Sequence, residues 1–319
     1  MDKLAVGDGE MPLCCDFIVL QSSHNDMVMK DYTGDRLSPQ DAETLIGALQ
    51  ESVVSETVRF HSGGGYQNLM VMRSGPLPGR LEPPQELVGE GIRKFIPQDR
   101  PYRELVHLMN EAQIILHNHP LNRRRLAENQ DAVNSVWFWG NGEPRELPPF
   151  EHRFGRSASV VTAAPLLRGM AVAAGMDAPR VAGATGFADT DYGMKLETAW
   201  RELETHDVVY LHLSGGEPVS LQGMIDDKIM VIEDFDEKIV GPLLREAERR
   251  GDLHLLVTEA QMTSVDRMKY EDNPVPFVVH TPQGAAGGQD RFDEDLVDGA
   301  GGRYASGPDL IEAFLKEAV

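Results

Sequence analysis

The sequence contains few of the residues that staple secreted proteins or bind nucleic acid. Its 319 residues include only two cysteines, Cys14 and Cys15. Because these are adjacent, a bridge between them would be strained. Acidic residues outnumber basic ones by 51 to 30, which gives a formal net charge of −21, whereas nucleic acids and anionic membranes attract a basic surface. The composition therefore excludes a disulfide framework and predicts neither nucleic acid nor a membrane as a partner.

Long apolar runs are also missing. The amino terminus, MDKLAVGDGEMPL, lacks the continuous apolar stretch of a signal peptide, and a run such as VVYL at 208–211 is far too short to cross a bilayer. We therefore expect a cytoplasmic protein. The residues that are present, 41% hydrophobic and 25% charged, are typical of a folded globular chain.

The first part of the chain mixes strand and helix patterns. Residues 14–20 and 68–72 are apolar runs of strand length. A Ser-Pro-Gln-Asp start predicts a helix over about 39–57, and a Pro followed by an apolar face predicts another over 101–116. Residues 74–99 are rich in Pro and Gly, so we expect a long loop there.

After about residue 135 the pattern changes to alternating strands and helices. Short, nearly continuous apolar runs, typical of parallel strands buried on both faces, occur at 135–140, 158–163, 207–213, 253–257 and 275–280. Helical patterns at 165–175, 191–205 and 222–249 separate most of them. This alternation predicts a doubly wound α/β sheet. We therefore divide the chain into a smaller domain, 1–135, and an α/β domain, 136–319. The Gly-rich acidic segment at 284–302 is expected to be a surface loop.

Two motifs in the first domain are candidates for ligand binding. His117 and His119 form a His-x-His pair, but neither a carboxylate nor a cysteine lies nearby in the sequence, which favours capping or packing over a metal site. Arg123, Arg124 and Arg125 form the densest basic cluster of the chain. Such a cluster either binds a phosphate or carboxylate through bidentate hydrogen bonds or lies on a solvated helix face.

The segment VAGATGFADTDYG, at 181–193, is the most informative motif of the second domain. Gly183 and Gly186 permit sharp turns after a short strand, and Asp189, Thr190 and Asp191 fall where a helix begins and can cap its free N–H groups. We expect an ordered loop at the carboxyl edge of the sheet, where α/β proteins bind their ligands.

Six segments, taken in order, resemble the archaeal-type, 2,3-bisphosphoglycerate-independent phosphoglycerate mutases of the alkaline phosphatase superfamily. They are HNHPLNRRRL, SVWFWGNG, VAGATGFADTDYGMK, DVVYLHL, IEDFDEKIVGPLL and NPVPFVVH. The resemblance implies an alkaline-phosphatase-like doubly wound core, incomplete at the amino end, with an inserted smaller α+β substrate domain. It also implies interconversion of 3-phosphoglycerate and 2-phosphoglycerate through a phosphoserine, with two divalent metals, manganese or zinc.

The metal-ligand positions implied by this resemblance carry mostly unsuitable residues. The family motif His-Val-Glu-Ala-Pro-Asp-Glu-Ala-Gly-His corresponds to HLSGGEPVSL at 212–221, so Glu217 stands for an Asp ligand and Leu221 for a His ligand. Ala260 and Gln261 replace an Asp and a His, and Tyr270 replaces another His. Leucine and alanine offer no lone pair, and an amide oxygen is a weak ligand. We therefore expect no metal cofactor.

Two further departures concern the nucleophile and the substrate. The nucleophile of the family lies in an amino-terminal segment, and we expect this chain to begin after that segment. The family's Tyr-Arg-His reads Tyr66-Gln67-Asn68 here, which removes a cation suited to a phosphoglycerate.

The resemblance and the substitutions together predict a catalytically defective family member that acts as a binding or regulatory scaffold. Its expected ligand is a phosphorylated small acid, and the candidate contacts are His119, Arg123, Arg124, Arg125, Asp189 and His212. One alternative is an active mutase or related phosphotransferase whose nucleophile segment is missing here or is supplied by another chain. Another is a structural subunit that forms a homo-oligomer, or pairs with a partner chain, through exposed strand edges.

Overall fold

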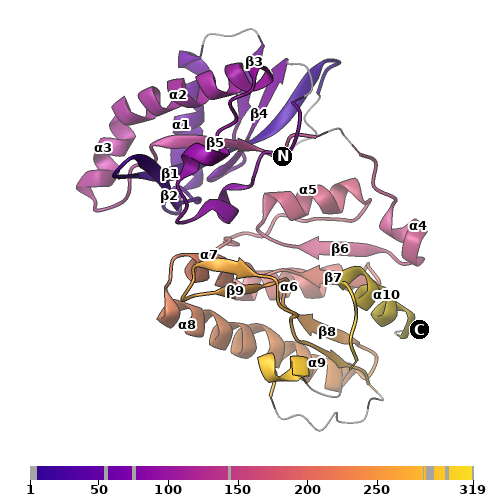
Figure 1. Cartoon of the computed structure of the whole chain (residues 1–319). Helices are drawn as coiled ribbons and strands as arrows, with labels where there is room; N and C mark the ends of the chain where they lie inside the picture. Colours follow the sequence, from indigo (N-terminus) through magenta and orange to yellow (C-terminus); the bar gives the residue numbers. More distant parts are fainter. Residues whose placement is uncertain are drawn as a thin grey trace. The chain divides into compact units, whose positions relative to one another are not determined.

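The computed structural model describes residues 6–53, 57–73, 77–142, 145–282, 284, 291–298 and 302–317. The chain forms two compact units, Met1–Arg145 and Glu146–Val319. Figure 1 shows the helices and strands of each unit. Within the described residues, no helix combines the length and the apolar character that spanning a lipid bilayer requires.

The first unit is built on a five-stranded antiparallel sheet. Its longest strand, β1 (Glu10–Ser23), pairs with β2 (Asp26–Asp31), β4 (Gln67–Arg73) and β5 (Ser135–Trp139), and β3 (Val58–His61) pairs with the free side of β4. The two predicted strands at 14–20 and 68–72 are thus confirmed as parts of β1 and β4.

The described part of the first unit also contains the α-helices α1 (Pro39–Ser52), α2 (Arg103–Asn118) and α3 (Pro120–Ala127). The hydroxyl of Ser38 accepts a hydrogen bond from the Asp41 N–H, so the predicted start of α1 is confirmed. Helix α1 contacts α2 and β3, and α2 packs on β5. The expected loop before α2 contains three short 3₁₀ helices, η1 (Pro84–Leu87), η2 (Ile92–Phe95) and η3 (Arg100–Tyr102).

The placement of β5 corrects the sequence prediction. Residues 135–140 are expected to belong to the parallel sheet of the second domain, but β5 pairs antiparallel with β1 in the first unit. All five residues of β5 are buried, and a strand buried on both faces has the same apolar pattern in either kind of sheet. The two units consequently divide after Arg145, about ten residues beyond the predicted boundary at 135.

The second unit contains the predicted α/β arrangement. Strands β6 (Ala158–Val161) and β7 (Val208–Leu211) form a parallel pair. Between them the chain forms α5 (Pro165–Ala173) and α6 (Tyr192–Glu202), and α6 contacts both strands. Parallel neighbours need such a helical crossover, and the α/β class is confirmed.

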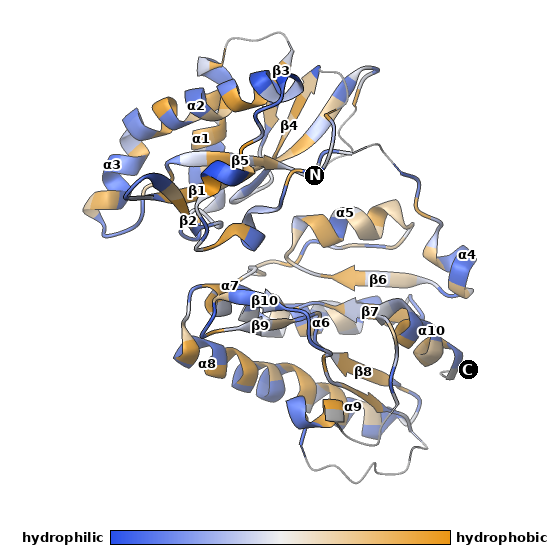
Figure 2. Cartoon of the chain, in the orientation of Figure 1, coloured by the Kyte–Doolittle hydropathy of each residue, from blue (hydrophilic) through white to orange (hydrophobic). Residues whose placement is uncertain are grey.

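The next part of the second unit is a long helical segment. Helix α7 (Gly216–Leu221) precedes α8 (Ile225–Phe235), which continues through one π-helical turn, η4 (Asp236–Val240), into α9 (Gly241–Arg250). The helix predicted over 222–249 is therefore confirmed from Ile225 onward. Figure 2 shows apolar and polar residues alternating along α8 and α9, whereas β6 and β8 are mostly apolar.

The last strands pair differently from the prediction. Strand β8 (Leu255–Thr258) is antiparallel to β11 (Phe277–His280), and the chain between them forms a hairpin of β9 (Met262–Ser264) and β10 (Lys269–Glu271). The connection from β8 to β11 thus lacks the helical crossover that usually joins parallel neighbours. The remaining helices are α4 (Phe150–Phe154), η5 (Glu294–Asp298) and α10 (Gly307–Glu317). The expected loop at 284–302 includes η5, and its other parts lie largely outside the described residues.

Candidate functional site

The candidate site lies at the carboxyl ends of the two parallel strands in the second unit. Thr162 follows β6 and His212 follows β7, and the Thr162 hydroxyl is 3.0 Å from Nδ1 of His212. Lys195, in the first turn of α6, has no exposed surface and donates from Nζ to the His212 carbonyl oxygen at 3.2 Å. Three polar side chains thus meet where α/β proteins bind ligands.

Burial sets the charges of this group. It lowers the pKa of His212 to about 4, and the positive charge of Lys195 adds to that effect. Burial also lowers the pKa of Lys195 to about 8. At neutral pH, His212 is therefore neutral and Lys195 is predominantly protonated, which leaves one fixed cation beneath the strand ends.

The GATGFADTDYG loop leads into α6 and is held by its own side chains. Asp191 caps α6 by accepting from the Met194 N–H at 2.9 Å, which confirms the predicted helix start. Thr185 donates from its N–H to the Thr190 hydroxyl oxygen at 3.1 Å and from its own hydroxyl to Asp189 Oδ1 at 2.9 Å. Asp189 is exposed, and its hydrogen bond from Thr185 gives it a role in ordering the loop.

The position of this loop also explains why residue 215 is a glycine. A Cβ at Gly215 would lie 3.0 Å from backbone atoms of Phe187, closer than an ordinary contact allows. The close approach of the chain after β7 to the GATGFADTDYG loop therefore requires glycine at this position.

Two of the five positions that the family resemblance assigns to metal ligands are joined by a direct hydrogen bond. Tyr270, on β10, donates from its hydroxyl to Oε1 of Glu217, in α7, at 3.0 Å. Leu221 ends α7 and is buried, with 1% of its surface exposed. Ala260 and Gln261 lie on the exposed turn after β8. Of the five positions, only Glu217 therefore carries a carboxylate or imidazole group.

These residues do not fit a pair of divalent metals. A two-metal site needs several carboxylate or imidazole donors converging on each ion. Among the five positions assigned to metal ligands, Glu217 is the one carboxylate. Its Oε1 already accepts a hydrogen bond from the Tyr270 hydroxyl. The Leu221 side chain brings hydrocarbon to a buried position, which cannot coordinate a metal.

The predicted arginine cluster of the first unit does not act as one anion-binding surface. Arg125 is 2% exposed and donates to the carbonyl oxygens of Asp131, Gly34 and Asp35 at 2.9, 2.9 and 3.0 Å. Arg124 pairs with Asp41 at 2.7 Å, and Arg123 is exposed. The prediction that Arg125 binds a ligand is corrected, because its donors are engaged in joining α3 to the loop after β2.

His119 also has a structural role. It is the cap of α3, and its Nδ1 accepts a hydrogen bond from the Leu121 N–H at 3.2 Å. Burial lowers the pKa of His119, with a smaller effect from the nearby charge of Arg123. The capping interpretation of the His-x-His motif is confirmed for His119.

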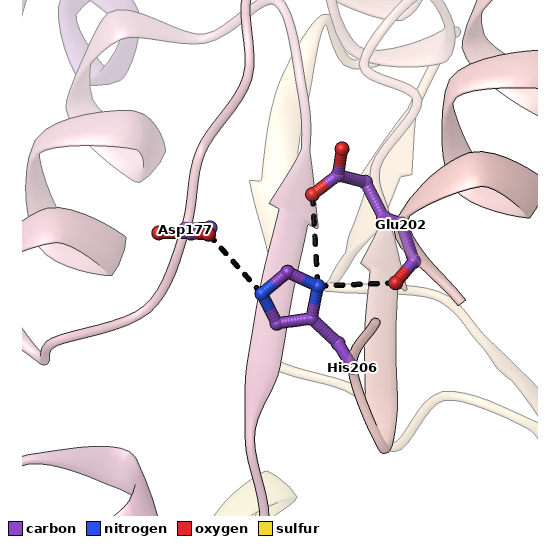
Figure 3. A group of neighbouring side chains, drawn as sticks. All are labelled: Asp177, Glu202 and His206. Atoms are coloured by element: carbon purple, nitrogen blue, oxygen red, sulfur yellow. Dashed lines mark hydrogen bonds and ion pairs between the residues drawn. The ribbon is translucent and has the colours of Figure 1, made fainter. Parts of the chain in front are cut away.

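A further group of side chains has no signal in the sequence. Asp177, Glu202 and His206 place their ligand atoms within 4.8 Å of one another, and within the described parts of the chain no other group of three or more His, Cys, Asp or Glu side chains does so (Figure 3). The three residues come from the segment after α5, the end of α6 and the turn before β7. Their spacing of 25 and 4 residues matches no ligand motif, so only the fold brings them together.

Comparison with known proteins establishes the family. The family model described as 2,3-bisphosphoglycerate-independent phosphoglycerate mutase matches residues 3–122. A probable 2,3-bisphosphoglycerate-independent phosphoglycerate mutase of Geobacter sulfurreducens is 34% identical over 315 residues, which cover 97% of this chain and 78% of that protein. A 2,3-bisphosphoglycerate-independent phosphoglycerate mutase of Methanosarcina mazei is 31% identical over 293 residues, covering 91% and 74%. The chain belongs to this family.

A solved structure agrees with the fold. The PH0037 protein of Pyrococcus horikoshii superposes with a TM-score of 0.59 at 18% sequence identity, over 88% of this chain and 66% of that one. At this identity the likeness concerns the arrangement of helices and strands.

Proposed function

We propose that this chain is a phosphoglycerate mutase family member that has lost the two-metal site and acts as a binding or regulatory scaffold in the cytoplasm. The observation that carries the proposal is the Tyr270–Glu217 hydrogen bond beside the buried Leu221. A hydroxyl and an alkyl group stand where the family resemblance requires metal ligands.

Phosphoryl transfer through a hydroxyl nucleophile needs a metal or base to lower the nucleophile's pKa, and positive charge to hold the phosphoryl oxygens. In the second unit, Lys195 is a buried cation beside the strand ends. His212 has a pKa of about 4, so it is neutral at physiological pH and adds no positive charge there. The single positive charge of the Lys195 ammonium is much less than that of two divalent ions. This difference supports binding of the ligand without turnover.

The proposed ligand is a phosphorylated small acid bound at the carboxyl ends of β6 and β7. Thr162 and His212 offer hydrogen-bonding groups at this edge, and Lys195 supplies the positive charge beneath it. The charge matters because the chain carries a net charge of −21, which otherwise repels an anionic ligand.

The second candidate function is an active phosphoglycerate mutase. It is favoured by the 34% identity to a relative with that name and by the ordered GATGFADTDYG loop beside Thr162 and His212. Under this candidate, catalysis depends on groups other than Leu221, Ala260, Gln261 and Tyr270.

The experiment is a turnover assay of the full chain with 3-phosphoglycerate and manganese, run beside a thermal-shift series with the same compound. We expect no 2-phosphoglycerate above background and a higher Tm with 3-phosphoglycerate, since a ligand that binds the native state raises its melting temperature. Measurable turnover would establish the second candidate instead. If 3-phosphoglycerate is not converted and does not raise the Tm, the proposed ligand is refuted.

A matched variant tests why activity is lost. It restores the implied ligand set with Glu217→Asp, Leu221→His, Ala260→Asp, Gln261→His and Tyr270→His. We expect this variant to bind manganese more tightly than the parent. Equal binding by the two proteins would show that these positions do not decide metal affinity.

Self-association is tested separately. A scaffold of the proposed kind works as a monomer or as an oligomer, whereas a purely structural subunit requires a partner. A concentration-independent monomer in analytical ultracentrifugation, together with binding of 3-phosphoglycerate, would exclude the purely structural alternative.

A further inference from the structure

The Asp177–Glu202–His206 group has the features of a small metal site. Nε2 of His206 lies 3.2 Å from Oδ2 of Asp177, and Nδ1 lies 3.7 Å from Oε2 of Glu202. Figure 3 shows the two carboxylates on opposite sides of the imidazole. The side chains of His206 and Glu202 are 13% and 14% exposed, whereas that of Asp177 is 73% exposed.

The backbone holds the three residues in place. The backbone of Asp177 makes two hydrogen bonds to β6. Its N–H donates to the Ala158 carbonyl at 3.0 Å, and its carbonyl accepts from the Val160 N–H at 2.8 Å. Ser159, fully buried, donates from its hydroxyl to Oε2 of Glu202 at 2.9 Å. The N–H of His206 donates to the Glu202 carbonyl at 2.9 Å. The ligand atoms are therefore presented by strand and helix ends, which favours precise geometry.

Two tautomers of His206 are compatible with its neighbours. Nδ1 lies 3.0 Å from the Glu202 carbonyl oxygen, which only accepts, and 3.1 Å from the Thr205 hydroxyl, which either donates or accepts. With the hydrogen on Nδ1, Nε2 presents its lone pair toward Oδ2 of Asp177 at 3.2 Å. In that tautomer the two acceptors repel each other, and a metal ion bound to both relieves the repulsion.

A metal fits this gap. Zinc binds imidazole nitrogen and carboxylate oxygen at about 2.0–2.2 Å, which at a tetrahedral angle places the two ligand atoms roughly 3.4 Å apart. A metal-bound histidine usually donates its other N–H to a carbonyl or carboxylate. Both groups are supplied here by Glu202, through its backbone oxygen and its side chain.

We propose that His206 and Asp177 bind a divalent transition metal of the zinc type, with Glu202 as a positioning residue on the opposite side of the ring. The exposure of Asp177 leaves the remaining coordination positions open to water or to a small ligand. This site is separate in sequence and in contacts from the Glu217, Leu221, Ala260, Gln261 and Tyr270 positions, and it does not depend on the function proposed above.

The test is a titration of the full chain with Zn²⁺ by calorimetry and with Co²⁺ by visible absorption. We expect one equivalent of metal with a Co²⁺ spectrum of nitrogen and oxygen ligation, and at least tenfold weaker binding for His206→Gln and for Asp177→Asn.

The matched control is His107→Gln. His107 and Glu111, on α2, form a similar pair with 3.3 Å between Nε2 and Oε1, but their side chains are 70% and 41% exposed. We expect this variant to bind zinc as the parent does. A loss equal to that of His206→Gln would mean adventitious surface binding, and unchanged binding by both His206→Gln and Asp177→Asn would overturn the proposal. Circular dichroism of each variant checks that it is folded.

The outcome is distinguishable from that of the scaffold proposal. Zinc bound at the family's metal positions would persist in His206→Gln and weaken in Glu217→Gln. Zinc bound at the site inferred here would show the reverse pattern. Absence of any zinc or cobalt binding would refute this inference and leave the scaffold proposal standing.

Discussion

The two units each bury a basic side chain, and they treat it differently. In the first unit, Arg125 donates to three backbone carbonyls and also lies near the carboxylates of Asp35 and Asp41. In the second, Lys195 donates to the carbonyl of His212, although an ammonium has three N–H groups. Arg125, with three hydrogen bonds, joins structural elements, whereas Lys195, with one among the described residues, lies at strand ends where a ligand can use its charge.

The strands show the same contrast. Every residue of β5 in the first unit is buried, whereas β7 and β8 in the second unit consist of half-exposed and exposed residues. All three strands are apolar in sequence. These strands are therefore more completely buried in the first unit than in the second, although both units hold buried groups with shifted pKa values, Asp16 in the first and Lys195 and His212 in the second.

The largest expected effect comes from breaking the Arg125 network. Arg125→Met leaves buried and partly buried backbone carbonyls without their donor, and Asp35 without its ion pair, so we expect a loss of about 3–5 kcal/mol in the free energy of unfolding. The measurement is urea unfolding followed by the fluorescence of Trp137 and Trp139, which lie in the first unit. Arg124→Met, at an exposed ion pair, serves as the control and should cost less than about 1 kcal/mol. Equal losses would contradict the structural role of Arg125.

The variant Lys195→Met tests the second buried cation of this comparison. Removing a buried, sparingly bonded charge should leave stability at pH 7 unchanged or raise it by about 1–4 kcal/mol. The folded pKa of about 8 lies below the ordinary value of 10.5, so the unfolded chain binds more protons between these two values. Parent stability should therefore rise from pH 8 to 10.5, and the rise should be absent in the variant. A strongly destabilised Lys195→Met would place Lys195 in the same class as Arg125.

Asp16 gives a pH-dependent effect in the first unit. It is buried on β1 and accepts from Nε1 of Trp139 at 2.9 Å, and burial raises its pKa to about 8. Because the folded pKa lies above the unfolded value of 3.8, the stability contributed by the protonated form is present below pH 4 and is lost as pH rises through 8.

Asp16→Asn removes this titration. The parent should lose stability as pH rises from 4 to 8, and the variant should depend much less on pH over this range. Denaturant unfolding at a series of pH values measures both. The same pH slope in the two proteins would mean that Asp16 is ionised in the folded chain at neutral pH.

The features that the sequence predicted are local ones. The Ser38 cap of α1 and the Asp191 cap of α6 depend on residues within one helical turn, so side-chain type and spacing were sufficient. The partner of β5 depends instead on β1, more than 100 residues away, and an apolar run carries no information about its neighbour's direction. The antiparallel pairing of β8 with β11 escaped prediction for the same reason.

In the candidate site too, the sequence indicates individual positions but not the long-range contacts between them. Family resemblance identified the positions of Glu217 and Tyr270, but their mutual hydrogen bond requires two elements 53 residues apart to meet. Arg125 was interpreted as a ligand contact because its bonds to Gly34 and Asp35 span about 90 residues. The Asp177–Glu202–His206 group exists only after the β6–α6–β7 crossover has formed.

The most direct test of the central claim, that the family's two-metal site is lost, is a Mn²⁺ titration followed by electron paramagnetic resonance. It is best made in the His206→Gln background, so that the inferred zinc-type site does not contribute. The account predicts that added Mn²⁺ stays free in solution at concentrations that saturate an active family member. Tight binding of two equivalents of Mn²⁺ per chain would contradict it.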